Sequence, residues 1–305
     1  MTHTPIIGIV QDKYAFPDAL HFLELGKRLG AQHLELKFEL NLDAQYNLRG
    51  PTALEIRKKA EQHRISLSVH APYDDGVNLG AADSETWAET RRQMMACLHF
   101  ADKIGAQYIT VHGGHFEIEP QTIVAETPGQ PNRVTVRQRA DQAEFAALKA
   151  RTLEELSWLV GEGSRLGIKV ALENFHDFST FKVRFPLNPE DFQECLAAVS
   201  GLYVNYDSGH GHSTGLHILD FIHGIGVKHI IGTHLHDNKR LGDEHLPLLQ
   251  GTIDFASFFT SYLQENWAFP LNVEAKNLAD LEASWAVLKK LRNSVEKGWA
   301  DAGNS

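Results

Sequence analysis

Eight short apolar runs, each followed by a longer and mostly amphipathic stretch, constrain the fold of this chain most strongly. The runs are rich in β-branched residues, and in chain order they are Ile6–Val10, His33–Phe38, Leu67–His70, Tyr108–His112, Lys169–Glu173, Tyr203–Asp207, Ile230–His234 and Leu271–Glu274. The stretches between them include Asp18–Leu29, Leu54–His63, Glu85–Ile104, Glu144–Leu166 and Ala256–Glu265. Repeated alternation of strand and helix predicts parallel strands joined by crossover helices.

Three similar turns support a repeated joint between helix and strand. Gly30, Gly105 and Gly167 each follow a helical stretch and precede a predicted strand. Glycine just past a helix end supplies the left-handed conformation that lets the chain turn back. An open doubly wound sheet would also fit the alternation, but no Gly-x-Gly-x-x-Gly follows the first strand. We therefore predict an α/β fold, a single (β/α)₈ TIM-barrel domain over residues 1–305.

One long segment, Phe116–Asp141, breaks the pattern. It contains Pro120, Pro128, Gly129 and Pro131, and it follows the fourth predicted strand. Irregular connections of this length in a compact domain are usually lids or binding loops. The segment is predicted to be a lid insertion, and a plain surface excursion is the alternative.

Composition narrows the classes of partner. The formal net charge of −10 argues against a broad surface for nucleic acid, although a small phosphorylated ligand needs only a few local cations. Cys97 and Cys195 suggest no disulfide framework and fit a reducing compartment. No apolar run is long enough to span a membrane and no secretory signal is visible, so we expect a cytoplasmic protein without membrane contact.

Residues able to bind metal recur where the predicted strands end. Consecutive strands, the third to the eighth, end in or next to His70, His112, Glu173, Asp207, His234 and Glu274, and the following loops add His210, Asp243 and His245. The carboxyl ends of the strands in such a barrel meet at one rim, where active sites lie. Carboxylates crowded there would repel one another without a cation. The mixture of nitrogen and oxygen ligands suits zinc, manganese or iron better than magnesium.

Each of these residues also has a simpler explanation. A single histidine at a strand end is more often a hydrogen-bonded structural residue than a ligand. Glu173 could pair with Lys182 or Arg184, and Asp207 could cap the next helix. Suitable residues on consecutive strands nevertheless favour a shared metal site.

The order and spacing of these residues resemble one known family. The chain is similar to the xylose isomerase-like barrels, which include sugar isomerases and epimerases and the endonuclease IV type of nuclease. The resemblance runs from the second strand to the eighth, and its motifs are His70-Ala71-Pro72-Tyr73, Val111-His112-Gly113, Glu173-Asn174, Asp207-Ser208-Gly209-His210, His234-Leu235-His236-Asp237, Asp243-Glu244-His245 and Val273-Glu274.

The isomerase branch of this family implies one divalent ion. Its ligands match Glu173, Asp207, His234 and Glu274. The resemblance implies that the ion holds adjacent substrate oxygens while Glu173 and Glu274 move a proton between neighbouring carbons through an enediolate. His210 and Arg240 would then hold substrate hydroxyls.

The endonuclease-like branch implies three zinc ions and a metal-bound hydroxide that attacks phosphorus. Its nine ligands match His70, His112, Glu173, Asp207, His210, His234, Asp243, His245 and Glu274, all present here. The segment Leu248-Leu249-Gln250-Gly251 departs from the family's Leu-Gly-Glu-Gly, which puts the support of the third ion in doubt.

We favour a metal-dependent isomerase or epimerase of a small sugar or sugar phosphate, with one to three ions and Glu173 and Glu274 as catalytic residues. The alternatives are a multi-zinc phosphoester hydrolase of a small substrate, repair of abasic DNA, and a non-catalytic barrel. The substrate, the metal and the oligomeric state stay open, and a homo-oligomer would be compatible with the sequence. The predicted substrate-binding residues are His115, His176, His236, Lys182, Arg184, Lys239 and Arg240.

Overall fold

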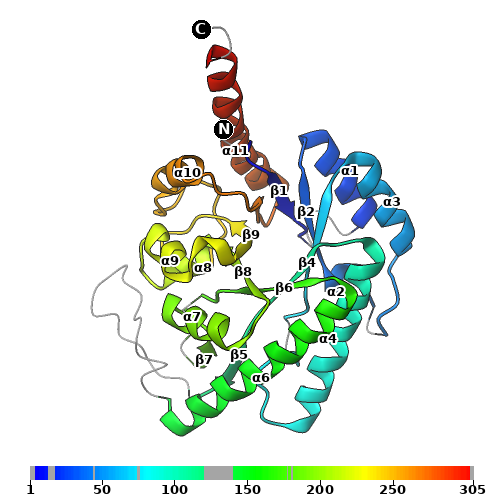
Figure 1. Cartoon of the computed structure of the whole chain (residues 1–305), viewed down its shortest axis with the longest axis vertical. Coiled ribbons are helices and arrows are strands. Elements are labelled where there is room, and N and C mark those ends of the chain that lie inside the picture. Colours follow the sequence, from blue (N-terminus) through cyan, green and yellow to red (C-terminus); the bar gives the residue numbers. More distant parts are fainter. Residues whose placement is uncertain are drawn as a thin grey trace.

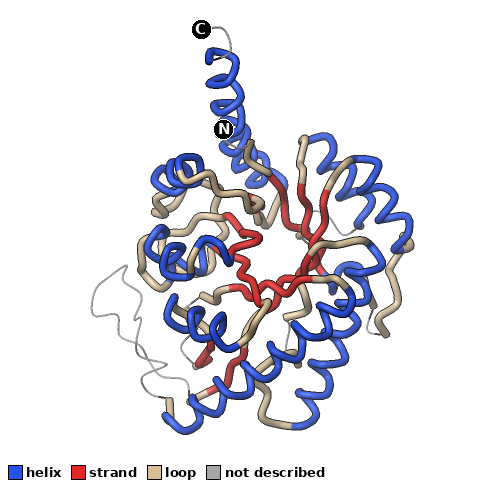
Figure 2. The backbone as a smooth tube through the Cα atoms, viewed as in Figure 1, coloured by secondary structure: helices blue, strands red, loops and turns tan. Residues whose placement is uncertain are grey.

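The computed structural model describes residues 4–12, 18–43, 45–73, 76–119, 140–176, 178–179 and 181–302, with side chains described up to residue 293. Eight parallel strands close into a barrel in the order β1-β10-β9-β8-β6-β4-β3-β2. Figure 2 shows them as a central ring surrounded by helices. They are β1 (Ile7–Val10), β2 (His33–Lys37), β3 (Ser66–His70), β4 (Tyr108–Val111), β6 (Lys169–Glu173), β8 (Leu202–Asp207), β9 (Ile230–Leu235) and β10 (Leu271–Val273). The predicted closed barrel and its eight strands are confirmed.

Helices lie around this ring, most of them against its outer side (Figure 1). They are α1 (Ala19–Leu29), α2 (Phe38–Asn41), α3 (Ala53–His63), α4 (Ser84–Ile104), α6 (Gln142–Leu166), α7 (Pro189–Ala198), α8 (Ser208–Ser213), α9 (Ile218–Ile225), the 3₁₀ turn η1 (Val227–His229), α10 (Phe255–Gln264) and α11 (Leu278–Ala302). Gly30, Gly105 and Gly167 end α1, α4 and α6 with φ of 78°, 74° and 74°. These left-handed caps confirm the predicted helix-to-strand joint. Among the described residues, no helix is both long and apolar enough to cross a membrane.

Two further strands lie outside the barrel. β5 (Gly114–Glu117) follows β4, β7 (Lys182–Phe185) follows β6, and the two pair antiparallel. Residues 120–139, which make up most of the predicted lid, lie outside the described residues. The first residues of that segment, Phe116 and Glu117, belong to β5.

The barrel interior is polar, whereas its outer face packs on an apolar shell. His33 on β2 lies 3.3 Å from the Tyr108 hydroxyl on β4, and Glu35 on β2 contacts His234 on β9. These strands are not neighbours in the barrel, so the contacts cross its lumen. Their residues are fully or almost fully buried. Leu34 and Leu36 alternate with them along β2 and belong to the apolar core outside the ring.

Close packing at β1 makes one substitution informative. A Cβ atom on Gly8 would lie 2.1 Å from Asn272 Oδ1 and 2.5 Å from the His33 carbonyl oxygen. Because that backbone oxygen cannot rotate away, we expect Gly8→Ala to lower the free energy of unfolding by about 1–3 kcal/mol. Chemical denaturation measures this change. Gly161→Ala on α6 is the matched control, since no atom lies within 4 Å of its Cβ and the helix should gain roughly 0.5–1 kcal/mol. Equal stability of the two variants would contradict the packing described here.

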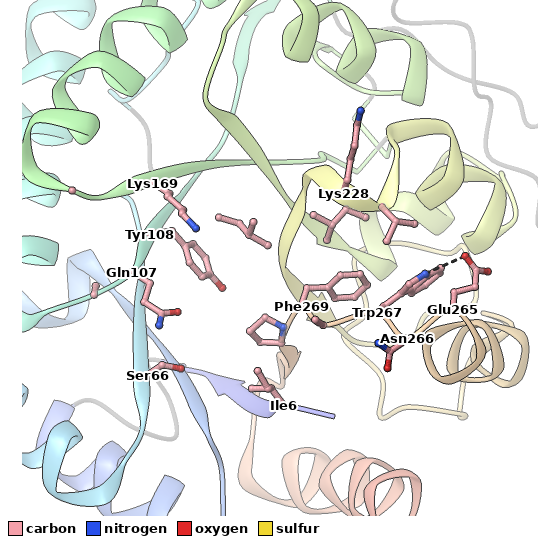
Figure 3. Close-up of a pocket in the computed structure, with 17 residues that line it drawn as sticks. Ile6, Ser66, Gln107, Tyr108, Lys169, Lys228, Glu265, Asn266, Trp267 and Phe269 are labelled. Atoms are coloured by element: carbon pink, nitrogen blue, oxygen red, sulfur yellow. Dashed lines mark hydrogen bonds between the residues drawn. The ribbon is translucent and has the colours of Figure 1, made fainter. Parts of the chain in front are cut away.

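The two ends of the barrel differ in chemistry. A depression of about 1070 Å³ lies at the amino-terminal ends of the strands, and its lining includes Ser66, Tyr108, Lys169, Trp267 and Phe269 (Figure 3). The described residues that line it include none of the predicted metal or substrate residues. This end of such barrels usually serves stability, whereas the opposite end carries the chemistry.

Candidate metal centre

His234 lies between three carboxylates at the carboxyl end of the barrel. Its Nδ1 is 3.1 Å from Glu173 Oε1, 3.4 Å from Glu274 Oε2 and 3.9 Å from Asp207 Oδ2. The four side chains come from the ends of β6, β8, β9 and β10, Glu274 being the residue after β10. They converge because the carboxyl ends of parallel strands meet at the same rim.

Two more histidines approach the second oxygen of Glu173. His70 Nε2 and His112 Nε2 each lie 3.2 Å from Glu173 Oε2. The Glu173 carboxylate therefore contacts His234 through Oε1 and this histidine pair through Oε2. Within the described part of the chain, its ion pairs are with histidines and not with Lys182 or Arg184, which was the simpler explanation for its presence.

A third group lies beside the first two. His245 Nε2 is 3.0 Å from Asp243 Oδ2, and His210 Nε2 is 3.8 Å from Asp243 Oδ1. Asp207 links this group to the barrel, since its Oδ1 accepts the His210 backbone N–H at 2.6 Å as the cap of α8. The capping role considered for Asp207 is thus real, and it coexists with a place in the cluster. The structure brings together all nine residues matched to the family's ligands.

Backbone carbonyls fix two of the histidine rings. His70 Nδ1 donates to the carbonyl of Ala71 at 2.8 Å, and His210 Nδ1 donates to the carbonyl of Asn174 at 2.8 Å. In His70 the Nε2 atom is left to face Glu173, and in His210 the Nε2 atom is left to face Asp243 while Nδ1 also lies 3.5 Å from Glu173 Oε1. Such contacts hold the tautomer that a metal ligand needs.

The charges within the cluster depend strongly on one another. Burial lowers the pKa of the His234 imidazole, but the carboxylates of Glu173 and Glu35 outweigh burial and raise that pKa well above its ordinary value. Burial raises the pKa of the Glu173 carboxyl, but His234 holds it well below its ordinary value. The Glu274 carboxyl follows the same rule, because Lys37 and His234 offset its burial and lower its pKa.

The donor set fits a divalent metal ion. Within the described residues, Glu173 Oε2, His112 Nε2 and Asp243 Oδ1 are buried atoms that make no hydrogen bond, although His112 Nε2 lies 3.2 Å from Glu173 Oε2. One ligand atom from each of Glu173, Asp207 and His234 lies within 4.8 Å of the others, and the same holds for His70, His112 and Glu173. Buried polar groups normally have partners, so converging atoms that lack them indicate a cation site.

A cavity of about 390 Å³ opens above these residues. Two of the predicted substrate-binding residues, His176 and Arg184, line it. The candidate ligands in its lining are His70, His112, Glu173, His210, Asp243, His245 and Glu274. His115 and Lys182, on β5 and β7, instead line a smaller side pocket of about 60 Å³ that shares Tyr73, His112, Phe175 and Arg184 with the cavity. The paired strands β5 and β7 thus form one wall of the site.

Three predicted substrate-binding residues, His236, Lys239 and Arg240, line neither the cavity nor the side pocket, and their contact with substrate stays a prediction. His236 is 1% exposed and its Nε2 lies 3.1 Å from Asp207, so it supports the cluster from below. Its ring also stacks on His245 at 3.8 Å between centroids. Lys239 is exposed outside the cavity lining. Arg240 has a positive φ of 63°, and its Nη2 lies 3.4 Å from His212 Nδ1 instead of reaching the cavity.

Sequence reasoning missed the contribution of β2. Glu35 and Lys37 both point into the barrel, and Lys37 Nζ lies 3.0 Å from Glu274 Oε1. The signal was available in the alternation of His33-Leu34-Glu35-Leu36-Lys37, in which charged residues share one face of the strand. The cavity lining also includes residues that were not predicted to belong to the site, among them Asp12, Tyr73, Phe175 and Lys276.

The comparisons with known proteins agree with this architecture. A Methanocaldococcus jannaschii protein described as uncharacterised is 22% identical over 275 residues, which cover 89% of this chain and 85% of that protein. The solved structure of a D-tagatose 3-epimerase-like protein matches with a TM-score of 0.75 and 19% identity, covering 98% of this chain and 99% of the other. Endonuclease IV from Thermus thermophilus matches with a TM-score of 0.65 and 18% identity, covering 96% of this chain and 100% of the other. The family model of the xylose isomerase-like TIM barrels matches residues 23–291. The chain therefore belongs to this family.

Proposed function

We propose that the chain is a divalent-metal-dependent isomerase or epimerase of a small sugar or sugar phosphate. The observation that carries this proposal is that Glu173 and Glu274 both lie beside His234 Nδ1, at 3.1 and 3.4 Å, and that both line one cavity. Two carboxylates that face one substrate-sized space can remove a proton from one carbon and return it to the same or the next carbon.

The residues around the cavity would have different roles in the reaction. A divalent ion held by Glu173, Asp207, His234 and Glu274 would polarise substrate oxygens and so acidify a proton beside a carbonyl. Glu173 and Glu274 would transfer that proton. Lys37 lies 3.0 Å from Glu274 and would keep this carboxylate ionised until it receives the proton. Arg184, Lys37 and Lys276 line the walls and would hold hydroxyls or a phosphate group.

The similarity to a D-tagatose 3-epimerase-like protein supports this choice, although at 19% identity it speaks to the fold and not to the substrate. The cavity of about 390 Å³ suits a small polar molecule. The formal net charge of −10 does not favour long nucleic acid as the substrate.

Exchange of hydrogen with solvent tests the proposal. The Mn²⁺- or Co²⁺-loaded chain is incubated in D₂O with a panel of ketoses and ketose phosphates, and products are followed by NMR and mass spectrometry. We expect one deuterium to enter the carbon beside the carbonyl, together with an aldose or an epimer. The metal-free chain is the control. Turnover without any exchange, or no turnover across the panel, would contradict the proposal.

A multi-zinc phosphoester hydrolase is the second candidate. The observation that favours it is the His70–His112 pair, which faces Glu173 Oε2 and exceeds what a single ion requires. The group of His210, Asp243 and His245 would hold a further ion. Two or three zinc ions per chain with hydrolysis of bis(p-nitrophenyl) phosphate would favour this candidate. One ion per chain with exchange of deuterium would favour the isomerase.

A further inference from the structure

A carboxylate from the opposite side of the barrel contacts Nε2 of the His234 imidazole, the nitrogen that does not face Glu173 and Glu274. His234 Nε2 lies 2.6 Å from Glu35 Oε1, and both side chains are fully buried. Because β2 and β9 are separated by β1 and β10 in the ring, this contact spans the lumen. It is the shortest of the contacts that His234 makes with a carboxylate among the described residues.

Glu35 is itself fixed by hydroxyl groups. Its Oε2 accepts the Ser68 hydroxyl at 2.7 Å and the Thr110 hydroxyl at 2.9 Å. Ser68 Oγ also lies 3.0 Å from His33 Nε2, and His33 Nδ1 lies 2.8 Å from Ser66 Oγ at the floor of the barrel. The hydrogen-bonded column therefore runs from the floor, where Figure 3 labels Ser66, up to the metal centre.

This arrangement decides which nitrogen of His234 can bind an ion. The carboxylate of Glu35 accepts only, so Nε2 carries the proton that it donates to Glu35 when the ring is neutral. The lone pair is then on Nδ1, the nitrogen that faces Glu173 and Glu274. A carboxylate behind a ligating histidine also makes the imidazole a stronger donor and restricts rotation of its ring.

We propose that Glu35 is a positioning residue of the metal centre, which selects Nδ1 of His234 as the ligand atom and sets the orientation of the ring. Ser68 and Thr110 act through Glu35 by holding its second oxygen. The inference rests on the proposed metal-dependent function, and it adds a residue on β2 that is not among the nine residues matched to the family's ligands, although one of its oxygens lies within 4.8 Å of ligand atoms of His70 and His234. The alternative is that Glu35 only stabilises the buried histidine and has no effect on metal affinity.

Cobalt titration distinguishes these explanations. Co²⁺ is added to metal-free wild-type chain and to Glu35→Gln, Glu35→Ala and Ser68→Ala, and its d–d absorption gives both the Kd and the geometry of the site. We expect Glu35→Gln, which keeps the shape of the side chain, to weaken binding about 10-fold, and Glu35→Ala to weaken it up to about 100-fold. Ser68→Ala should have a smaller effect of the same sign and shift the spectrum less.

A matched control separates positioning from general loss of a buried carboxylate. Glu155 is 4% exposed and makes two hydrogen bonds with Arg91, at 2.8 and 2.9 Å, between α6 and α4. Glu155→Gln should lower thermal stability and leave the Kd for Co²⁺ unchanged. In ¹⁵N NMR spectra of the Zn²⁺-loaded wild-type chain, His234 should be metal-bound at Nδ1 and protonated at Nε2.

The outcomes separate this inference from the proposed function. Unchanged Co²⁺ affinity and spectrum in folded Glu35→Gln, or a His234 bound through Nε2, would overturn the positioning role while the metal centre stands. A wild-type chain that binds no Co²⁺ would overturn both. Weaker binding in Glu35→Gln with normal binding in Glu155→Gln would establish the role.

Discussion

Replacing Glu173 with glutamine is expected to lower kcat/KM for the proposed isomerisation by about 10²–10⁴-fold. Glu173 is 1% exposed and contacts His234 through one oxygen and His70 and His112 through the other. The amide cannot take a proton from the substrate, and it offers an ion a weaker ligand without charge. The variant is measured by steady-state kinetics at saturating metal, alongside its metal content.

Glu155→Gln is the control for this substitution, since it also removes a buried carboxylate but lies between α4 and α6, away from the cavity. It should keep wild-type kcat/KM. Activity of Glu173→Gln within a few-fold of the wild type, with metal bound, would remove Glu173 from the catalytic residues.

Removing the metal is expected to destabilise the chain most at alkaline pH. A ligand that binds only the folded state stabilises it by about 2.7 kcal/mol when its free concentration is about 100 times the Kd. In the metal-free chain, burial lowers the pKa of His210, but Asp207 and Asp243 outweigh burial and raise it well above the ordinary value, and the pKa of His234 is raised as well. These protonated histidines neutralise the carboxylates in the place of an ion.

The sign of the pH effect follows from these raised values. A histidine with a raised pKa stabilises the folded state below its unfolded pKa of about 6.5, and this stabilisation is lost as the pH rises through the folded pKa. Metal ions bind the neutral imidazole and so gain affinity over the same range. Thermal unfolding with and without Zn²⁺ should therefore give a larger difference in Tm at about pH 8 than at about pH 5.5. An equal or smaller difference in Tm at about pH 8 would contradict the idea that protonated histidines neutralise the carboxylates when no metal is bound.

The barrel could be predicted because its strands are buried on both faces and joined by helices. Such strands read as short runs rich in apolar residues, with polar residues alternating in β2 and β3, and left-handed glycines such as Gly30 and Gly105 mark the helix ends. The paired strands β5 and β7 were not predicted. Each has four residues, and their register is set by contact between two segments that are far apart in the sequence.

The convergence of the candidate ligands could be predicted from their positions, because His70, Glu173 and Asp207 end strands whose carboxyl ends share a rim. Glu35 was missed although the alternation along β2 places it on the same face as His33 and Lys37, because that alternation does not show that Glu35 contacts His234 across the lumen. The substrate-binding role of Arg240 stays a prediction, and the position of its side chain could not be read from the sequence. Its backbone conformation in the loop after β9 directs it toward His212.

We propose that side chains from different strands share a divalent cation at the carboxyl end of the barrel. An anomalous difference map from crystals of the chain grown with Mn²⁺ or Zn²⁺ tests it most directly. We expect a peak about 2.0–2.2 Å from Glu173, Asp207, Glu274 and the Nδ1 atom of His234. A map without a peak at this rim, from crystals whose metal content is confirmed by X-ray fluorescence, would contradict it.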